Sequence, residues 1–181
     1  MKPKLLIISD LWGFSNSNWI SMYQKLLVNS YDIVLYDAPK LAAINATNLT
    51  EEEIHKQFVN GGIKKAVDKL VATETEKIDV LAFSIGGTIV WKAALKGLKV
   101  KSLLSVSSTR LRKETKKPKT EIQLLFGEND MYKPGKDWFK TLKVNYKVIE
   151  KLNHNMYKEQ QIANLVCENL NITHHENINI R

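Results

Sequence analysis

The sequence predicts an α/β domain, a three-layer sandwich in which helices cover both faces of a mostly parallel, six-stranded sheet. Short apolar runs of strand length alternate along the chain with longer segments whose apolar residues recur at helical spacing. The chain has 181 residues, 44% of them hydrophobic and 25% charged, as expected for one soluble domain with its own core. We therefore expect a single domain over residues 1–172 and a flexible tail over residues 173–181, where the apolar pattern stops.

The first half of the chain alternates regularly between the two kinds of segment. Buried strands are expected at the short apolar runs of residues 4–9, 32–37 and 79–83. Helices are expected at residues 18–27, 50–71 and 85–96. The middle helix begins at a capping box formed by Thr50 and Glu53, and Gly61-Gly62 in its interior predicts a kink or a break.

The second half continues the alternation. Strands are expected at residues 100–106, 122–127 and 145–150. A short helix is expected at residues 134–142, and a longer helix at residues 156–170 closes the domain.

Cysteine use and hydropathy indicate the compartment. The single cysteine, Cys167, excludes an internal disulfide framework and is typical of a protein of the reducing cytoplasm. Cys167 lies in an apolar helical pattern, so we expect a buried thiol. No apolar run approaches the length of a membrane span, and we expect a cytoplasmic protein with no membrane partner.

Polar residues at the carboxyl ends of the strands are the candidates for function, because ligands bind there in parallel α/β sheets. Ser84 stands where the third strand turns into its helix, within the stretch AFSIGG. Its small neighbours Ala82 and Gly86 suit a strained strand–turn–helix that presents the serine as a nucleophile. The helix N-terminus would also direct backbone N–H groups toward the serine. A serine that caps an ordinary helix is the alternative interpretation.

Two further polar residues follow later strands. Asp130 comes after the strand at 122–127, in FGEND, and His154 comes after the strand at 145–150, in LNHNMY. Each residue alone is compatible with a surface loop. Together with Ser84 they supply, in chain order, the serine, the acid and the histidine that nucleophilic catalysis requires.

At these motifs the sequence resembles the α/β-hydrolases, over about residues 4–170. AFSIGG is similar to their nucleophile elbow, Gly127-x-x-Asp130 to their acid loop and LNHNMY to their histidine loop. The loop DLWGFSNSNW, residues 10–19, resembles the oxyanion loop of some small esterases.

The resemblance implies a role for each of these positions. Ser84, Asp130 and His154 would be the catalytic residues. The backbone N–H groups of Trp12 and Ile85 would form the oxyanion hole, with Leu11 as the alternative to Trp12.

The sequence also departs from the family pattern. Asp10-Leu11 stands where the family has His-Gly, which puts an acid near the site mouth and a side chain where the family has none. Only about fifteen residues separate Val106 from Ile122. Because many members carry a helical cap domain in this connection, the chain resembles the minimal members that have no cap.

The activity that the resemblance implies is hydrolysis of a carboxyl ester or thioester through an acyl-enzyme, with neither metal nor organic cofactor. One alternative is a non-catalytic ligand-binding protein on the same fold. Another is a basic interaction protein in which the three polar residues are incidental, since the formal net charge is +8.

The segment RLRKETKKPK, residues 110–119, concentrates positive charge in the connection where other members carry the cap. It has no interleaved aromatic residues, and no nucleic-acid-binding motif accompanies it, so nucleic acid is not the expected partner. Residues 10–19 resemble the corresponding loop of pimeloyl-acyl-carrier-protein methyl ester esterases. This implies an acidic acyl-carrier protein docked by Arg110, Arg112 and Lys113, besides small-molecule acyl esters or thioesters.

Overall fold

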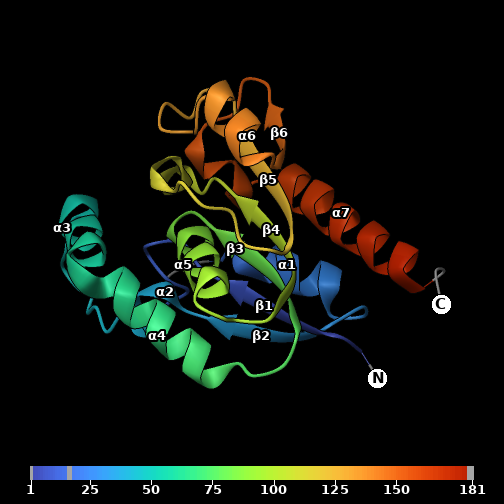
Figure 1. Ribbon diagram of the computed structural model, residues 1–181, viewed down its shortest axis with the longest axis horizontal. Coiled ribbons are helices and arrows are strands. Elements are labelled where there is room, and N and C mark those ends of the chain that lie inside the picture. Colours follow the sequence, from blue (N-terminus) through green and yellow to red (C-terminus); the bar gives the residue numbers. More distant parts are fainter. Residues whose placement is uncertain (1, 16–17, 179–181) are drawn as a thin grey trace.

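A six-stranded, wholly parallel sheet forms the centre of the protein in a computed structural model that describes residues 2–15 and 18–178 (Figure 1). The strand order is β2-β1-β3-β4-β5-β6. The strands are β1 (Lys4–Ile8), β2 (Asp32–Tyr36), β3 (Ile78–Phe83), β4 (Val100–Val106), β5 (Glu121–Gly127) and β6 (Asn145–Ile149).

Helices cover both faces of the sheet, as the sequence predicts, and strand alternation sends successive side chains into two separate cores. One core holds Leu6, Ile8, Val80 and Ala82, and the other holds Leu5, Ile7, Leu81 and Phe83. The first core is covered by α2 (Ala38–Leu41), α3 (Glu51–Gln57), α4 (Ile63–Thr73), α5 (Ile85–Leu95) and α6 (Lys136–Leu142). The second is covered by α1 (Ile20–Leu27) and α7 (Gln160–Ile178).

The prediction that residues 32–37 form a buried strand is wrong. This segment forms β2, which lies at the edge of the sheet beside β1 only, and no residue of the strand is fully buried. By contrast, every residue of β3 is buried, because β1 and β4 flank it and helices cover both of its faces. The nucleophile candidate therefore follows the most enclosed strand.

The long second helix breaks where the glycine pair predicts. After α3 the backbone forms a π-turn over Phe58–Gly62, in which Gly61 has a φ of 117°, before α4 begins. The capping box of Thr50 and Glu53 is formed at the start of α3. The break turns α3 away from α4, toward the carboxyl end of the sheet (Figure 1).

The closing helix differs from its predicted bounds at both ends. His154–Lys158 form a 3-10 turn, η3, and the α-helix begins only at Gln160. The helix then continues to Ile178, past the predicted end at residue 170. The flexibility of residues 173–181 stays a prediction, and residues 179–181 lie outside the described part of the chain.

The connection between β4 and β5 contains a single 3-10 turn, η2 (Thr109–Lys113), and no cap domain. The carboxyl edge of the sheet is therefore open on this side. Among residues 2–15 and 18–178, no helix has the length and apolar character that crossing a membrane requires.

Candidate active site

Ser84 occupies a sharp turn between β3 and α5. Its backbone has φ 49° and ψ −117°, which a non-glycine residue adopts only under strain, and its side chain makes no capping hydrogen bond to α5. The Ser84 N–H donates to the carbonyl of Val106 at 2.8 Å, which ties the turn to the end of β4. Ser84 therefore occupies a strained turn and is not an ordinary helix cap.

The turn requires glycine at position 86, two residues after Ser84. A Cβ on Gly86 would lie 2.6 Å from the carbonyl oxygen of Ser9 and 2.9 Å from that of Ile8. Both atoms belong to the backbone at the end of β1, which cannot swing aside as a side chain can. The absence of a side chain at Gly86 therefore lets the start of α5 pack directly against β1.

Two serines of β4 and its following loop support the turn, and the sequence analysis gave them no role. The Ser108 hydroxyl donates to the Ser84 carbonyl at 2.7 Å, and the hydroxyls of Ser105 and Ser108 are 2.6 Å apart. Both side chains are buried, and they fill the space beside Gly87. A run of serines in an apolar strand is the only signal in the sequence, and it gives no partner.

The structure brings Ser84, His154 and Asp130 together. The Ser84 Oγ lies 3.0 Å from His154 Nε2, and His154 Nδ1 lies 2.7 Å from Asp130 Oδ2. Asp130 is 3% exposed, and its second oxygen accepts the Tyr132 N–H at 3.2 Å. Asp130 follows β5 and His154 follows the neighbouring β6, so the parallel arrangement of the strands carries both side chains to the edge where Ser84 lies.

The loop after β1 lies beside this group, but its hydrogen bonds differ from those the family resemblance implies. The Trp12 N–H donates to Asp10 Oδ1 at 3.0 Å. Within the described part of the chain, the N–H groups of Leu11 and Ile85 have no hydrogen-bond partner. Asp10 lines the cavity that contains Ser84, but its side chain is only 1% exposed, so the expected acid is buried in the cavity wall.

Asp10 is satisfied on both carboxyl oxygens. Its Oδ2 accepts the Tyr157 hydroxyl at 2.9 Å and lies 3.8 Å from the Lys158 ammonium. Burial raises the pKa of Asp10 above its usual value, and the Tyr157 hydrogen bond, the Lys158 charge and the loop N–H groups oppose that rise. Burial likewise raises the pKa of Tyr157, so this hydroxyl is protonated and donates.

A cavity of about 710 Å³ opens over Ser84 and His154. Arg110 and Arg112 line it from η2, but Lys113, predicted to act with them, does not. Across the cavity, α3 contributes His55, whose pKa is lowered by burial and then by the charges of the two arginines. The sequence analysis assigned α3 no role in the site, because only the break after Gln57 turns this helix toward it.

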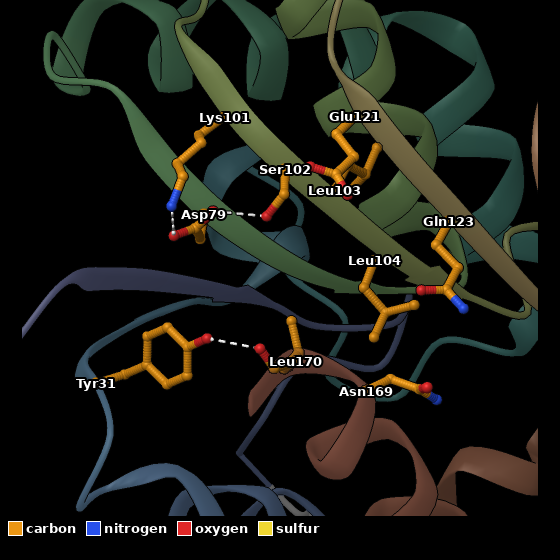
Figure 2. Close-up of a pocket in the computed structure, with 10 residues that line it drawn as sticks. All are labelled: Tyr31, Asp79, Lys101, Ser102, Leu103, Leu104, Glu121, Gln123, Asn169 and Leu170. Atoms are coloured by element: carbon orange, nitrogen blue, oxygen red, sulfur yellow. Dashed lines mark hydrogen bonds and ion pairs between the residues drawn. The ribbon is translucent and has the colours of Figure 1, made fainter. Parts of the chain in front are cut away.

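A second, much smaller hollow lies at the amino ends of the strands and is unconnected with Ser84 (Figure 2). Its volume is about 30 Å³, enough for about one water molecule. Asp79 at its wall accepts the Ser102 hydroxyl and pairs with Lys101 at 3.5 Å, so its charge is already compensated.

Neither a metal cluster nor a reactive thiol is found among the described residues. No group of three or more His, Cys, Asp or Glu side chains there is arranged to hold a metal ion. Cys167 is buried, as expected, and burial raises its thiol pKa to about 12.

Solved structures share this architecture. No family model matches the sequence, and no curated protein matches it. A protein from Xanthomonas campestris that is assigned to the alpha/beta hydrolase superfamily superimposes with a TM-score of 0.68 at 13% identity, over 95% of this chain and 99% of that one. Mouse alpha/beta hydrolase domain-containing protein 10 superimposes with a TM-score of 0.66 at 13% identity, over 97% of this chain and 91% of that one. Est1E from Butyrivibrio proteoclasticus, with ferulic acid bound, superimposes with a TM-score of 0.63 at 17% identity, over 97% of this chain and 89% of that one.

The protein therefore has the α/β-hydrolase fold, in a small form without a cap domain. The fold expectation from the sequence motifs is confirmed. At these identities the likeness establishes the fold, and the activity has to be argued from the residues of this chain.

We predict that Gly86→Ser lowers the free energy of unfolding by about 1–3 kcal/mol, because the new side chain overpacks the backbone of β1. Gly135→Ser is the matched control. A Cβ there meets nothing within 4 Å, and Gly135 precedes α6 at a position that serine suits. Urea unfolding followed by circular dichroism measures both. Equal midpoints for the two variants would show that the contact between α5 and β1 is not tight.

Proposed function

We propose that this protein is a serine hydrolase that cleaves carboxyl esters or thioesters through an acyl-enzyme on Ser84. The observation that carries the proposal is the pair of hydrogen-bond distances that link Ser84 to His154 and His154 to Asp130. A strained serine turn, a histidine at hydrogen-bond distance and a buried carboxylate behind the histidine are the parts of a nucleophilic triad.

The proton positions follow from what each partner can do. An ionised Asp130 carboxylate only accepts hydrogen bonds, so His154 Nδ1 carries the proton of that contact. In the neutral imidazole, His154 Nε2 is then unprotonated and accepts a hydrogen bond from the Ser84 hydroxyl. This tautomer is the one that removes a proton from the serine as its oxygen attacks a carbonyl carbon.

The reaction would proceed in two steps, acylation of Ser84 and hydrolysis of the acyl-enzyme. Ser84 Oγ forms a bond to the carbonyl carbon while its proton passes to His154, and the alcohol or thiol leaves with that proton. Water then attacks the acyl-enzyme, gives a proton to His154 and releases the acid, and the proton returns to Ser84. The positive charge on the imidazolium in each half is stabilised by Asp130.

The start of α5 supplies stabilisation for the developing oxyanion. The Ile85 N–H is the first backbone donor after the nucleophile and has no partner among the described residues. The N-terminus of α5 adds the positive end of the helix dipole at the same place. Loss of one such donor typically costs about 10²–10³ in turnover.

Hydrolysis of p-nitrophenyl acetate and of an acyl thioester tests the proposal. We expect Ser84→Ala to abolish turnover of both, and Asp130→Asn to lower kcat about 10⁴-fold because the histidine tautomer changes. Ser21→Ala, on the exposed surface of α1, should match the wild type. Full activity of Ser84→Ala, or a folded wild type that cleaves neither substrate, would contradict the proposal.

The non-catalytic alternative makes a different prediction in the same assay. A ligand-binding protein on this fold would gain thermal stability from a ligand without turnover, and Ser84→Ala would not change that gain. The intact geometry of Ser84, His154 and Asp130 favours the enzyme.

We also propose that the substrate is carried on an acidic acyl-carrier protein. Arg110 and Arg112 lie on η2 at the wall of the cavity over Ser84, and Lys113 follows them. A carrier docked on this turn would meet positive charge beside the entrance to the nucleophile.

Charge reversal separates a carrier-linked substrate from a small one. We expect Arg110→Glu together with Arg112→Glu and Lys113→Glu to raise KM for an acyl-carrier-protein ester at least tenfold and to spare p-nitrophenyl acetate. Lys116→Glu together with Lys117→Glu and Lys119→Glu is the control, since it makes the same charge change at exposed residues outside the cavity wall. Equal losses on both substrates would contradict carrier docking.

A further inference from the structure

The Asp10 carboxyl group stands out in the site because it binds the backbone N–H that the family resemblance assigns to the oxyanion hole. Its Oδ1 accepts the Trp12 N–H at 3.0 Å, a local turn in which an aspartate side chain binds the N–H of the residue after next. A backbone N–H that is committed to a carboxyl oxygen is a weaker donor to any second acceptor.

The contact between Asp10 and the Trp12 N–H is part of the buried structure of the protein. Asp10 is 1% exposed, and its other oxygen accepts the hydroxyl of Tyr157, which lies 147 residues further along the chain. Tyr157 is itself buried at the start of the closing helical segment, and its carbonyl accepts the Tyr23 hydroxyl at 2.8 Å. The orientation of the Asp10 side chain is therefore fixed by a buried residue that is distant in the sequence.

Phe14, in the same loop, is also anchored. The Phe14 N–H donates to Asp37 Oδ2 at 2.9 Å, so a second carboxylate holds the loop from the end of β2. Leu11 lies between the end of β1 and the anchored residues Trp12 and Phe14. Its N–H has no partner among the described residues.

Leu11 is also near the nucleophile turn. It lines the cavity that contains Ser84, and its side chain packs in the same apolar cluster as Ile85. The backbone that leads into Leu11 touches the start of α5, since the Ser9 carbonyl lies 2.6 Å from the Cβ position of Gly86. Two unpaired N–H groups, those of Leu11 and Ile85, are thus presented from the two segments that meet beside Ser84.

We propose that Asp10 is a positioning residue that withdraws the Trp12 N–H from the oxyanion hole and leaves the Leu11 N–H as the second donor, beside that of Ile85. This rests on the proposed serine hydrolase function. Asp10 acts through the loop backbone and does not touch the substrate.

Single amide-to-ester replacements in the backbone test the assignment, because an α-hydroxy acid at one position replaces its N–H with oxygen and keeps the side chain. The replacement at Leu11 is expected to lower kcat for p-nitrophenyl acetate about 10²–10³-fold, as is the replacement at Ile85. The replacement at Trp12 is expected to cost no more than that at Phe14. Phe14 is the matched control, since its N–H also binds a loop carboxylate.

Asp10 variants test the positioning role. Asp10→Ala is expected to lower kcat about 10–100-fold with KM little changed, because the Leu11 N–H loses its alignment. Asp10→Asn, whose amide oxygen can accept the same hydrogen bond from Trp12, should recover most of that loss. A rise in kcat for Asp10→Ala would overturn the proposal, since it would mean that the carboxyl group merely blocks Trp12.

The possible failures can be told apart. Suppose that the wild type hydrolyses p-nitrophenyl acetate, and that kcat falls as far for the Trp12 replacement as for the Ile85 replacement but not for the Leu11 replacement. The donor assignment is then wrong, and the serine hydrolase function stands. If the folded wild type shows no turnover, the function fails and the assignment falls with it. Thermal unfolding of each variant shows that a loss of rate is not a loss of fold.

Discussion

The close contact between the start of α5 and the end of β1 is the constraint on which the site depends. It is possible only because Gly86 has no side chain, as a Cβ there would lie 2.6 Å from the Ser9 carbonyl. The contact forces Ser84 into a φ of 49° and holds the loop after β1 beside the nucleophile. The strain at Ser84 is maintained by the packing around it, including the hydrogen bond from Ser108 to the Ser84 carbonyl.

The parallel sheet brings the Asp130 and His154 side chains to Ser84. Because all six strands run the same way, the loops after β1, β3, β5 and β6 meet at one edge. Asp130 and His154 follow adjacent strands, and this adjacency accounts for their 2.7 Å contact. The two acids of the site are both buried and both hydrogen-bonded, Asp130 to His154 and Asp10 to Trp12 and Tyr157.

The sequence was informative wherever a local pattern determines the structure. Small residues around Ser84 predicted the turn, Gly61-Gly62 predicted the break after α3, and the apolar runs located all of the strands in the described chain. Burial of residues 32–37 was mispredicted, because the position of β2 at the edge depends on strand order, which the apolar run does not encode. The hydrogen bond from the Trp12 N–H to Asp10 could not be predicted from the sequence either. It depends on the orientation of the Asp10 side chain, which is fixed by Tyr157, 147 residues further along the chain.

Labelling with a fluorophosphonate, followed by intact mass measurement and peptide mapping, tests the central claim most directly, because this reagent reacts with serines that a neighbouring base activates. The arrangement of Ser84, His154 and Asp130 predicts one adduct on the wild type, located at Ser84, and none on Ser84→Ala. An unlabelled, folded wild type, or an adduct that persists on Ser84→Ala, would contradict an activated nucleophile at this turn.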